Sequence, residues 1–302
     1  MNRCVCLWLL ALVLFATPLR AEQPALDAQT VRCRNGAVVS VNAEASDAGV
    51  AILKQGGNAV DSAVATALAL AVTHPAAGNI GGGGYMLVMT AQGHAEVFDF
   101  REVAPAAATR EMFVEPTGRT PHRRVGVPGT VRGLALAHVR YGRLPWRELA
   151  QPAVELARTG FALDASTAES LNGLLATSDK AAFAELHRVF GRTDGARWRA
   201  GDRLIQPDLA RTMQRLADEG ADGFYLGAVA DLIVAEMRRG GGIITREDLA
   251  SYRPIARQAL RGTYRGYEII SVPPSSSGGT TLIEALNILE NFDLDADRYS
   301  PA

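Results

Sequence analysis

The stretch GGNAVDSAVATALALAVTHPAAGNIGGGGYM, residues Gly56–Met86, decides the fold. Asn58 follows two glycines and can cap a helix, with Asp61 as its partner in a capping box. The helix predicted for residues 59–72 is apolar on nearly every face and is built of Ala, Val, Leu and small hydroxyl residues. We expect such a helix to be buried on both sides, with its small side chains lying close against a sheet.

A hairpin follows this helix. Residues 85–90 and 95–100 read as two strands joined by a turn at Gln92-Gly93, which predicts an antiparallel pair directly after the glycine-rich loop 74–84.

The remaining elements place helices in the middle of the chain and strands at both ends. We expect a short buried strand at 37–41, helices at 46–54, 130–140, 147–159, 164–190, 208–219 and 228–239, a hairpin of 254–260 with 264–272, and a last helix ending at 289. This order favours an α/β or α+β layered domain over a Rossmann fold, in which strands alternate regularly with helices.

Composition narrows the class of protein. The chain has 302 residues, of which 48% are apolar and 21% charged, as is usual for a soluble globular protein with a sizeable core. Its formal net charge of −1 argues against a nucleic-acid-binding protein, because such proteins carry a basic excess. A fibrous protein, a disordered tail and a multi-span membrane protein are excluded as well.

The N-terminus is typical of an export signal. Met1–Arg3 is short and basic, and Val5–Ala16 is an apolar run too short to span a bilayer comfortably at about 20 residues. Residues 1–21 therefore predict a secretory signal peptide cleaved after Ala21, with an uncleaved anchor as the alternative. We expect a secreted protein, with no stable membrane span, whose mature chain is 22–302.

Cysteine and histidine offer no metal site. Removal of the signal leaves Cys33 as the last cysteine, so the mature chain can form neither an internal disulfide nor a CxxC site. The five histidines are scattered without the spacing of metal ligands. The sequence predicts no metal and no cofactor.

Three segments resemble functional motifs but lack a part of them. The glycines of 81–84 follow a helix and precede a strand, the reverse of a phosphate-binding loop, which disfavours nucleotide binding. His74 is a candidate general base, but a structural role at the last helix carbonyls is favoured. The serine-rich loop 275–281 lacks the GxSxG pattern of an elbow serine hydrolase.

Arg101 is the main candidate for ligand binding. It stands at the strand end in Asp99-Phe100-Arg101-Glu102, where its planar guanidinium can bind a carboxylate through two parallel hydrogen bonds. An internal ion pair with Asp99, Glu102 or another acid is an equal alternative on local sequence alone.

Four segments in a fixed order carry a resemblance to a known family. They are Gly56–Met86, FDFREVAP at 98–105, VGVPGTVRGL at 125–134, and PPSSSGG followed by LNILE within 273–290. Together they resemble the γ-glutamyltransferases, or glutathione hydrolases, over essentially the whole chain after the signal. The resemblance implies an α+β fold, the αββα sandwich of N-terminal-nucleophile (Ntn) hydrolases, made as an inactive precursor.

The resemblance also implies a chemistry. The precursor cuts itself before a threonine, whose hydroxyl then acts as nucleophile with its own α-amine as base. The threonine takes the γ-glutamyl group from glutathione or another γ-glutamyl compound and passes it to water or an amino acid. By the same resemblance Arg101 binds the α-carboxylate of the glutamyl group, and we infer that Glu102 helps to hold Arg101.

The nucleophile itself is not found in this sequence. In the family it lies in a Thr-Thr-His stretch well downstream of the LNILE helix, whereas this sequence stops at Ala302. Thr280 and Thr281 lack the following histidine, and cleavage before Thr280 would free little more than one helix. We therefore expect 22–302 to be a partial large-subunit domain with no catalytic residue, incomplete without the small subunit and inactive alone, with a sheet face that favours association.

Four interpretations remain open. The chain is the product of a truncated or split gene of a working enzyme, or a structural half that needs a separately encoded small subunit. Alternatively it belongs to a related Ntn amidohydrolase or acylase with another substrate, such as a cephalosporin-type acylase, or it is a non-catalytic glutamyl-binding fragment. For the enzyme we expect export to the bacterial periplasm.

Overall fold

The structure is a computed structural model that describes residues 32–114 and 120–293. The chain divides into two compact units, Met1–Ala37 and Val38–Ala302, and every helix and strand below belongs to the second. The predicted signal peptide, residues 1–21, lies outside the described residues. Within the described ranges, no helix is long and apolar enough to cross a membrane.

The first two helices follow the capping signals of the sequence. Helix α2 (Ala59–Thr73) begins with the predicted capping box between Asn58 and Asp61. The fully buried Asp61 carboxylate also accepts the N–H groups of Arg143 and Leu144, at 3.0 and 3.4 Å, which fixes the start of α2 against a distant turn. Helix α1 (Ala43–Lys54) begins earlier than predicted because Asn42, and not Ser46, caps it.

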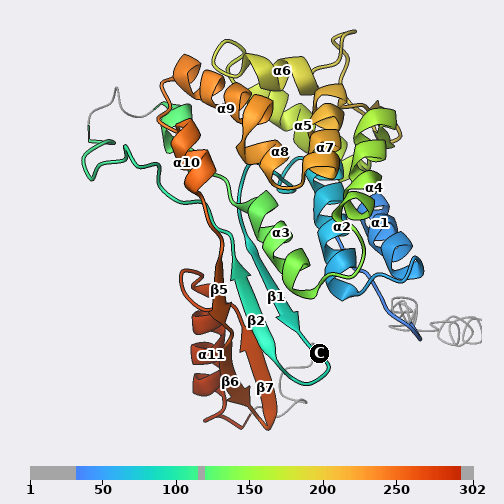
Figure 1. The fold of residues 1–302 in the computed structure, drawn as a ribbon, viewed down its shortest axis with the longest axis vertical. Coiled ribbons are helices and arrows are strands. Elements are labelled where there is room, and N and C mark those ends of the chain that lie inside the picture. The colour runs from blue at the N-terminus through green and yellow to red at the C-terminus, as the bar shows by residue number, and fades with distance from the viewer. Residues whose placement is uncertain (1–31, 115–119, 294–302) are drawn as a thin grey trace, which may run out of the picture. The chain divides into compact units, whose positions relative to one another are not determined.

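The predicted hairpin forms the centre of the sheet. Strand β1 (Tyr85–Met89) pairs antiparallel with β2 (Ala95–Asp99), and β2 pairs on its other side with β5 (Ile255–Gln258). Helix α3 (Thr130–Tyr141) lies beside this hairpin, and α2 packs against α3, as Figure 1 shows. The fold is therefore mixed α+β, as predicted.

The core lies between these helices and the sheet. Helix α2 packs against α1, α3 and α4 (Trp146–Thr159), and α4 packs in turn against α7 (Pro207–Glu219). As its composition predicts, α2 is buried on most of its faces. The largest fully buried side chains include Tyr225, Phe98, Ile52, Leu68, Leu134, Leu149 and Leu216.

The other elements are short strands and helices around this core. They are η3 (Pro121–Arg124), β3 (Phe161–Ala162), α5 (Ala165–Thr177), α6 (Ala184–Phe190), β4 (Arg203–Leu204), α8 (Asp222–Tyr225), α9 (Gly227–Gly240), α10 (Arg246–Ser251), β6 (Leu260–Tyr264), β7 (Tyr267–Ser271) and α11 (Gly278–Leu289). Helix α11 packs on the β6–β7 pair.

Three local predictions were wrong. Residues 37–41 form no strand, and Val39 is 93% exposed, because no neighbouring strand pairs with this segment in the described part of the chain. The helix expected at 164–190 is two helices, α5 and α6. The hairpin expected between 254–260 and 264–272 is instead β6 with β7 around Arg265-Gly266, both at positive φ, while β5 joins β2.

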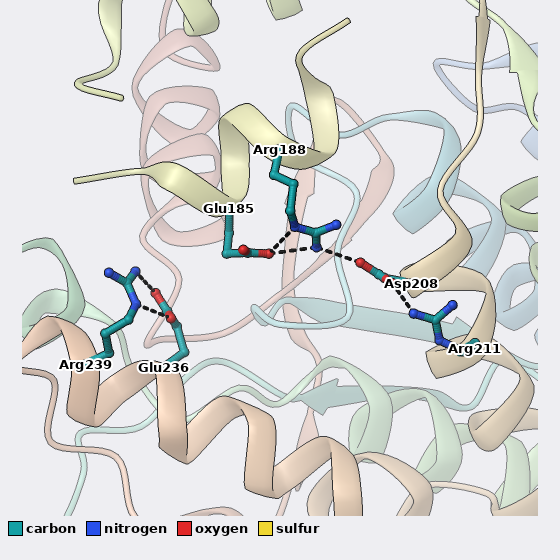
Figure 2. A network of polar contacts seen from close by, with 6 residues as sticks. All are labelled: Glu185, Arg188, Asp208, Arg211, Glu236 and Arg239. Atoms are coloured by element: carbon teal, nitrogen blue, oxygen red, sulfur yellow. Dashed lines mark hydrogen bonds and ion pairs between the residues drawn. The ribbon is translucent and has the colours of Figure 1, made fainter. Parts of the chain in front are cut away.

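Ion pairs connect the surfaces of α6 and α7, and another lies within α9. Arg188 of α6 contacts Asp208 of α7 at 2.6 Å, and Glu236 and Arg239 of α9 pair with each other (Figure 2). The Arg239 guanidinium and the ring of His122 hold the pKa of Glu236 at about 2, well below its ordinary 4.5. Exposed pairs of this kind contribute little to stability, because solvent screens the charges.

The low pKa of Glu236 predicts an acid-sensitive contribution to stability. A depressed carboxyl pKa stabilises the fold above pH 4.5 and stops doing so as the pH falls toward about 2. We expect the difference in free energy of unfolding between the wild type and Glu236→Gln to be largest above pH 4.5 and to shrink on acidification, measured by urea unfolding at stepped pH. A difference that is the same at every pH would contradict this assignment.

Candidate functional site

The structure brings the four family-like segments together around the end of β2. Phe100 exchanges hydrogen bonds with Gly84, at 3.0 and 3.3 Å, and Val103 pairs with Val127 at 2.8 and 3.3 Å. The residues between them, Arg101 and Glu102, are thus held where the glycine loop and the 125–129 loop meet. The serine-rich loop joins them at the start of β1, where the hydroxyls of Tyr85 and Ser275 lie 2.8 Å apart.

The glycine loop and helix α3 are joined by one carbonyl. The Gly82 carbonyl accepts the N–H groups of Gly129 and Thr130, at 2.7 and 3.1 Å. The side-chain oxygen of Asn79 accepts from Gly82 N–H and from the Thr130 hydroxyl, at 2.9 and 2.7 Å. The loop therefore presents a carbonyl, and not an N–H group, to the start of the helix.

Glycine at two positions lets α3 approach the end of β2. A Cβ atom at Gly129 would collide with the Phe100 carbonyl and the Tyr252 phenol, and a Cβ atom at Gly133 would collide with the Phe100 ring. Phe100 is therefore 6% exposed, and the residue after it lies at the edge of a rigid, tightly packed corner.

The Arg101 guanidinium is half-exposed at this corner. Asp99, which the sequence offers as an internal partner of Arg101, instead accepts a hydrogen bond from Arg257 Nε at 2.7 Å. Arg101 has one ion pair within residues 32–114 and 120–293, between its Nε and Glu102 Oε2 at 3.4 Å, and its side chain is 58% exposed. The internal pair with Asp99 is thus wrong, and the Arg101 side chain stays more than half exposed beside its pair with Glu102.

Glu102 lies where a supporting role is sterically possible. Its carboxylate sits against Gly83 and its Cβ against Gly126, and the side chain is 34% exposed. The contact with Arg101 fits the inferred support, and that role stays a prediction.

Two cavities lie near the glycine loop, and Arg101 lines neither. One, of about 830 Å³, is bordered by Pro75, Gly78 and the segment 188–194. The other, of about 420 Å³, is mainly apolar and is bordered by Ile80, Val125 and α9.

His74 occupies the end of α2. It is the C-cap residue, and its backbone N–H donates to the Leu70 carbonyl at 2.9 Å, while its own carbonyl accepts the Gly78 N–H at 2.7 Å. These are backbone contacts, and the role of the His74 imidazole stays a prediction.

Sequence reasoning missed three residues that build the site. Asn79 was visible only as part of the glycine-rich motif, although an Asn before a glycine run is a common side-chain acceptor for turns. Arg257 and Tyr252 carried no local signal, because their partners at the end of β2 are about 150 residues away in sequence.

Comparison with known proteins decides the family. The profile of the family described as Gamma-glutamyltranspeptidase matches residues 45–302. The chain belongs to the gamma-glutamyltranspeptidase family. The resemblance inferred from the four motifs is thereby confirmed, and the glycine loop, Arg101 and α3 all lie within the matched residues.

The relatives agree in sequence and in structure. The glutathione hydrolase proenzyme of Escherichia coli K12 is 46% identical over 271 residues, which are 87% of this chain and 46% of that protein. The gamma-glutamyltranspeptidase of Helicobacter pylori is 41% identical with a TM-score of 0.85, over 90% of this chain and 80% of the solved one. The cephalosporin acylase of Bacillus halodurans is 31% identical with a TM-score of 0.78, over 88% and 52%.

These comparisons confirm the predicted fold class. They also show how much of each relative this chain covers. The chain spans about half the length of the curated relatives that it matches.

The Asn79 contacts predict a specific loss of stability. Replacing Asn79 with Ala leaves the Gly82 N–H and the Thr130 hydroxyl without their acceptor, which should cost about 1–3 kcal/mol. Urea unfolding measures this cost, and hydrogen exchange should quicken at the amides of Gly82, Gly129 and Thr130. Asn291→Ala is the matched control, because the Asn291 amide is exposed at the end of α11 and should change stability by about 0.5 kcal/mol or less. Equal effects of the two variants would contradict the assignment.

Proposed function

We propose that this chain forms the glutamyl-binding part of a γ-glutamyltransferase, which cleaves the γ-glutamyl amide of glutathione and passes the acyl group to water or an amino acid. One observation carries the proposal. The Arg101 side chain, in a family motif, is 58% exposed and pairs with Glu102 through Nε alone, while the buried acid beside it is paired with Arg257. A planar cation that stays accessible in this way suits a carboxylate.

Arg101 acts here by holding the substrate. Its guanidinium binds the α-carboxylate, so that the γ-carbonyl is presented to a threonine hydroxyl supplied by the half of the enzyme that this chain does not cover. That hydroxyl attacks the carbonyl, the amine of the substrate leaves with a proton, and water or an amino acid then takes the acyl group. The carboxylate lies far from the bond that breaks, so Arg101 contributes equally before and during the reaction.

The partner in this proposal is the small subunit of the same precursor. The curated relatives are proenzymes covered to 46–48%, whereas the solved H. pylori chain is covered to 80%, as expected if the mature enzyme consists of shorter chains. The C-terminal elements also expose apolar side chains that suit a partner, with Ile255 50%, Leu282 48% and Ile288 56% exposed.

Export to the bacterial periplasm is part of the same proposal. It is supported by the leader pattern of residues 1–21 and by the bacterial relatives.

An acylase with another substrate is the second candidate. The likeness to the B. halodurans cephalosporin acylase favours it, since 88% of this chain is covered at 31% identity. Such an enzyme has no glutamyl α-carboxylate to bind and therefore no need of Arg101.

Substitution of Arg101 tests the proposal. The assay follows hydrolysis of γ-glutamyl-p-nitroanilide by this chain assembled with the threonine-bearing half, encoded in the same reading frame or co-expressed. Loss of a charge-assisted hydrogen bond costs about 1.5–3 kcal/mol, so Arg101→Ala should raise KM by about 10- to 150-fold with kcat much less changed. Arg101→Lys should fall in between, because lysine keeps the charge and loses the planar fork.

Arg140→Lys is the matched control. Arg140 is a half-exposed arginine paired with Glu96 at 2.9 Å, and its substitution should leave KM unchanged. An unchanged KM in Arg101→Ala would overturn the glutamyl-binding role and favour the acylase.

A further inference from the structure

The main chain of Arg101 is held at both of its polar atoms. Its N–H donates to Asp99 Oδ1 at 3.1 Å, and its carbonyl accepts the phenol O–H of Tyr252 at 3.0 Å. Asp99 itself is buried and paired with Arg257. The backbone of Arg101 is therefore fixed from two sides while its side chain stays accessible.

Tyr252 is itself rigidly placed. It is 4% exposed and stacks on the ring of Tyr225 with centroids 6.0 Å apart and an interplanar angle of 7°. Tyr225 donates its phenol O–H to the Pro128 carbonyl at 2.9 Å. Arg132 of α3 donates to the Tyr252 carbonyl at 2.6 Å. The Tyr225 phenol and the Tyr252 backbone are thus both hydrogen-bonded to the 125–132 segment, and the two rings stack on each other.

The Tyr252 phenol also fits the space that Gly129 leaves open. A Cβ atom at position 129 would collide with the phenol oxygen. Burial raises the pKa of Tyr252, so the phenol keeps its proton and remains a donor to the Arg101 carbonyl.

We propose that Tyr252 is a positioning residue, whose phenol O–H fixes the Arg101 peptide so that the guanidinium is held ready for the substrate α-carboxylate. This inference rests on the proposed function. Without the phenol, the peptide of Arg101 gains freedom that must be lost again when the carboxylate binds, and binding weakens as a result.

The test is Tyr252→Phe, which removes one oxygen and keeps the stacked ring. In the assembled enzyme, loss of one hydrogen bond should raise KM for γ-glutamyl-p-nitroanilide by about three- to tenfold, with kcat within about twofold. Tyr141→Phe is the matched control, because its phenol donates to Glu96 at 2.8 Å in the body of β2, away from Arg101. It should leave KM unchanged.

A substrate without the α-carboxylate separates positioning from a general structural effect. In 4-aminobutanoyl-p-nitroanilide Arg101 has nothing to bind, so Tyr252→Phe and wild type should have the same kcat/KM. An equal loss on both substrates, or no loss on either, would overturn the positioning role. Asp99→Asn, which weakens the other contact of the Arg101 backbone, should give the same pattern and serves if Tyr252→Phe does not fold.

The Arg101 variants keep the two proposals distinguishable. If Arg101→Lys raises KM and Tyr252→Phe does not, only the positioning role fails. If neither variant changes KM, the glutamyl-binding function fails with it.

Discussion

The site depends on one carbonyl that joins two distant loops. The Gly82 carbonyl accepts the N–H groups of Gly129 and Thr130 at the start of α3. The Asn79 side chain accepts the Thr130 hydroxyl at the same place. These N–H groups have no partner within the helix, so the glycine loop satisfies them and fixes where α3 begins. The glycine loop leads into β1, and the 125–129 loop leads into α3. The contact between them therefore fixes both segments relative to each other.

The contact between the glycine loop and α3 also fixes the surroundings of Arg101. Close approach at Gly129 and Gly133 leaves no room for the end of β2 to move, because interiors are packed as densely as crystals. Asp99 is buried and meets Arg257 across the sheet, so that its charge is not available to Arg101. The result is a fixed backbone with an accessible cation, an arrangement that suits the proposed binding of a carboxylate.

The family match includes the residues of this corner. It covers residues 45–302, which contain Arg101 and the loops that hold it. Three polar residues contact Arg101: Asp99 and Tyr252 bind its backbone, and Glu102 pairs with its side chain. The chain spans about half the length of its curated relatives, and in the proposed function this part of the enzyme binds and orients the substrate.

The sequence by itself determined what depends on near neighbours. The capping box at Asn58, the apolar helix after it and the hairpin of β1 and β2 were all predictable, because caps, periodicity and turns act over a few residues. Only the tertiary structure decided that β5 pairs with β2 and that 164–190 breaks into two helices. It also decided that Arg257 pairs with Asp99 and that the Tyr252 phenol donates to the Arg101 carbonyl. Those outcomes join residues about 150 positions apart or depend on packing, and no local pattern encodes such partners.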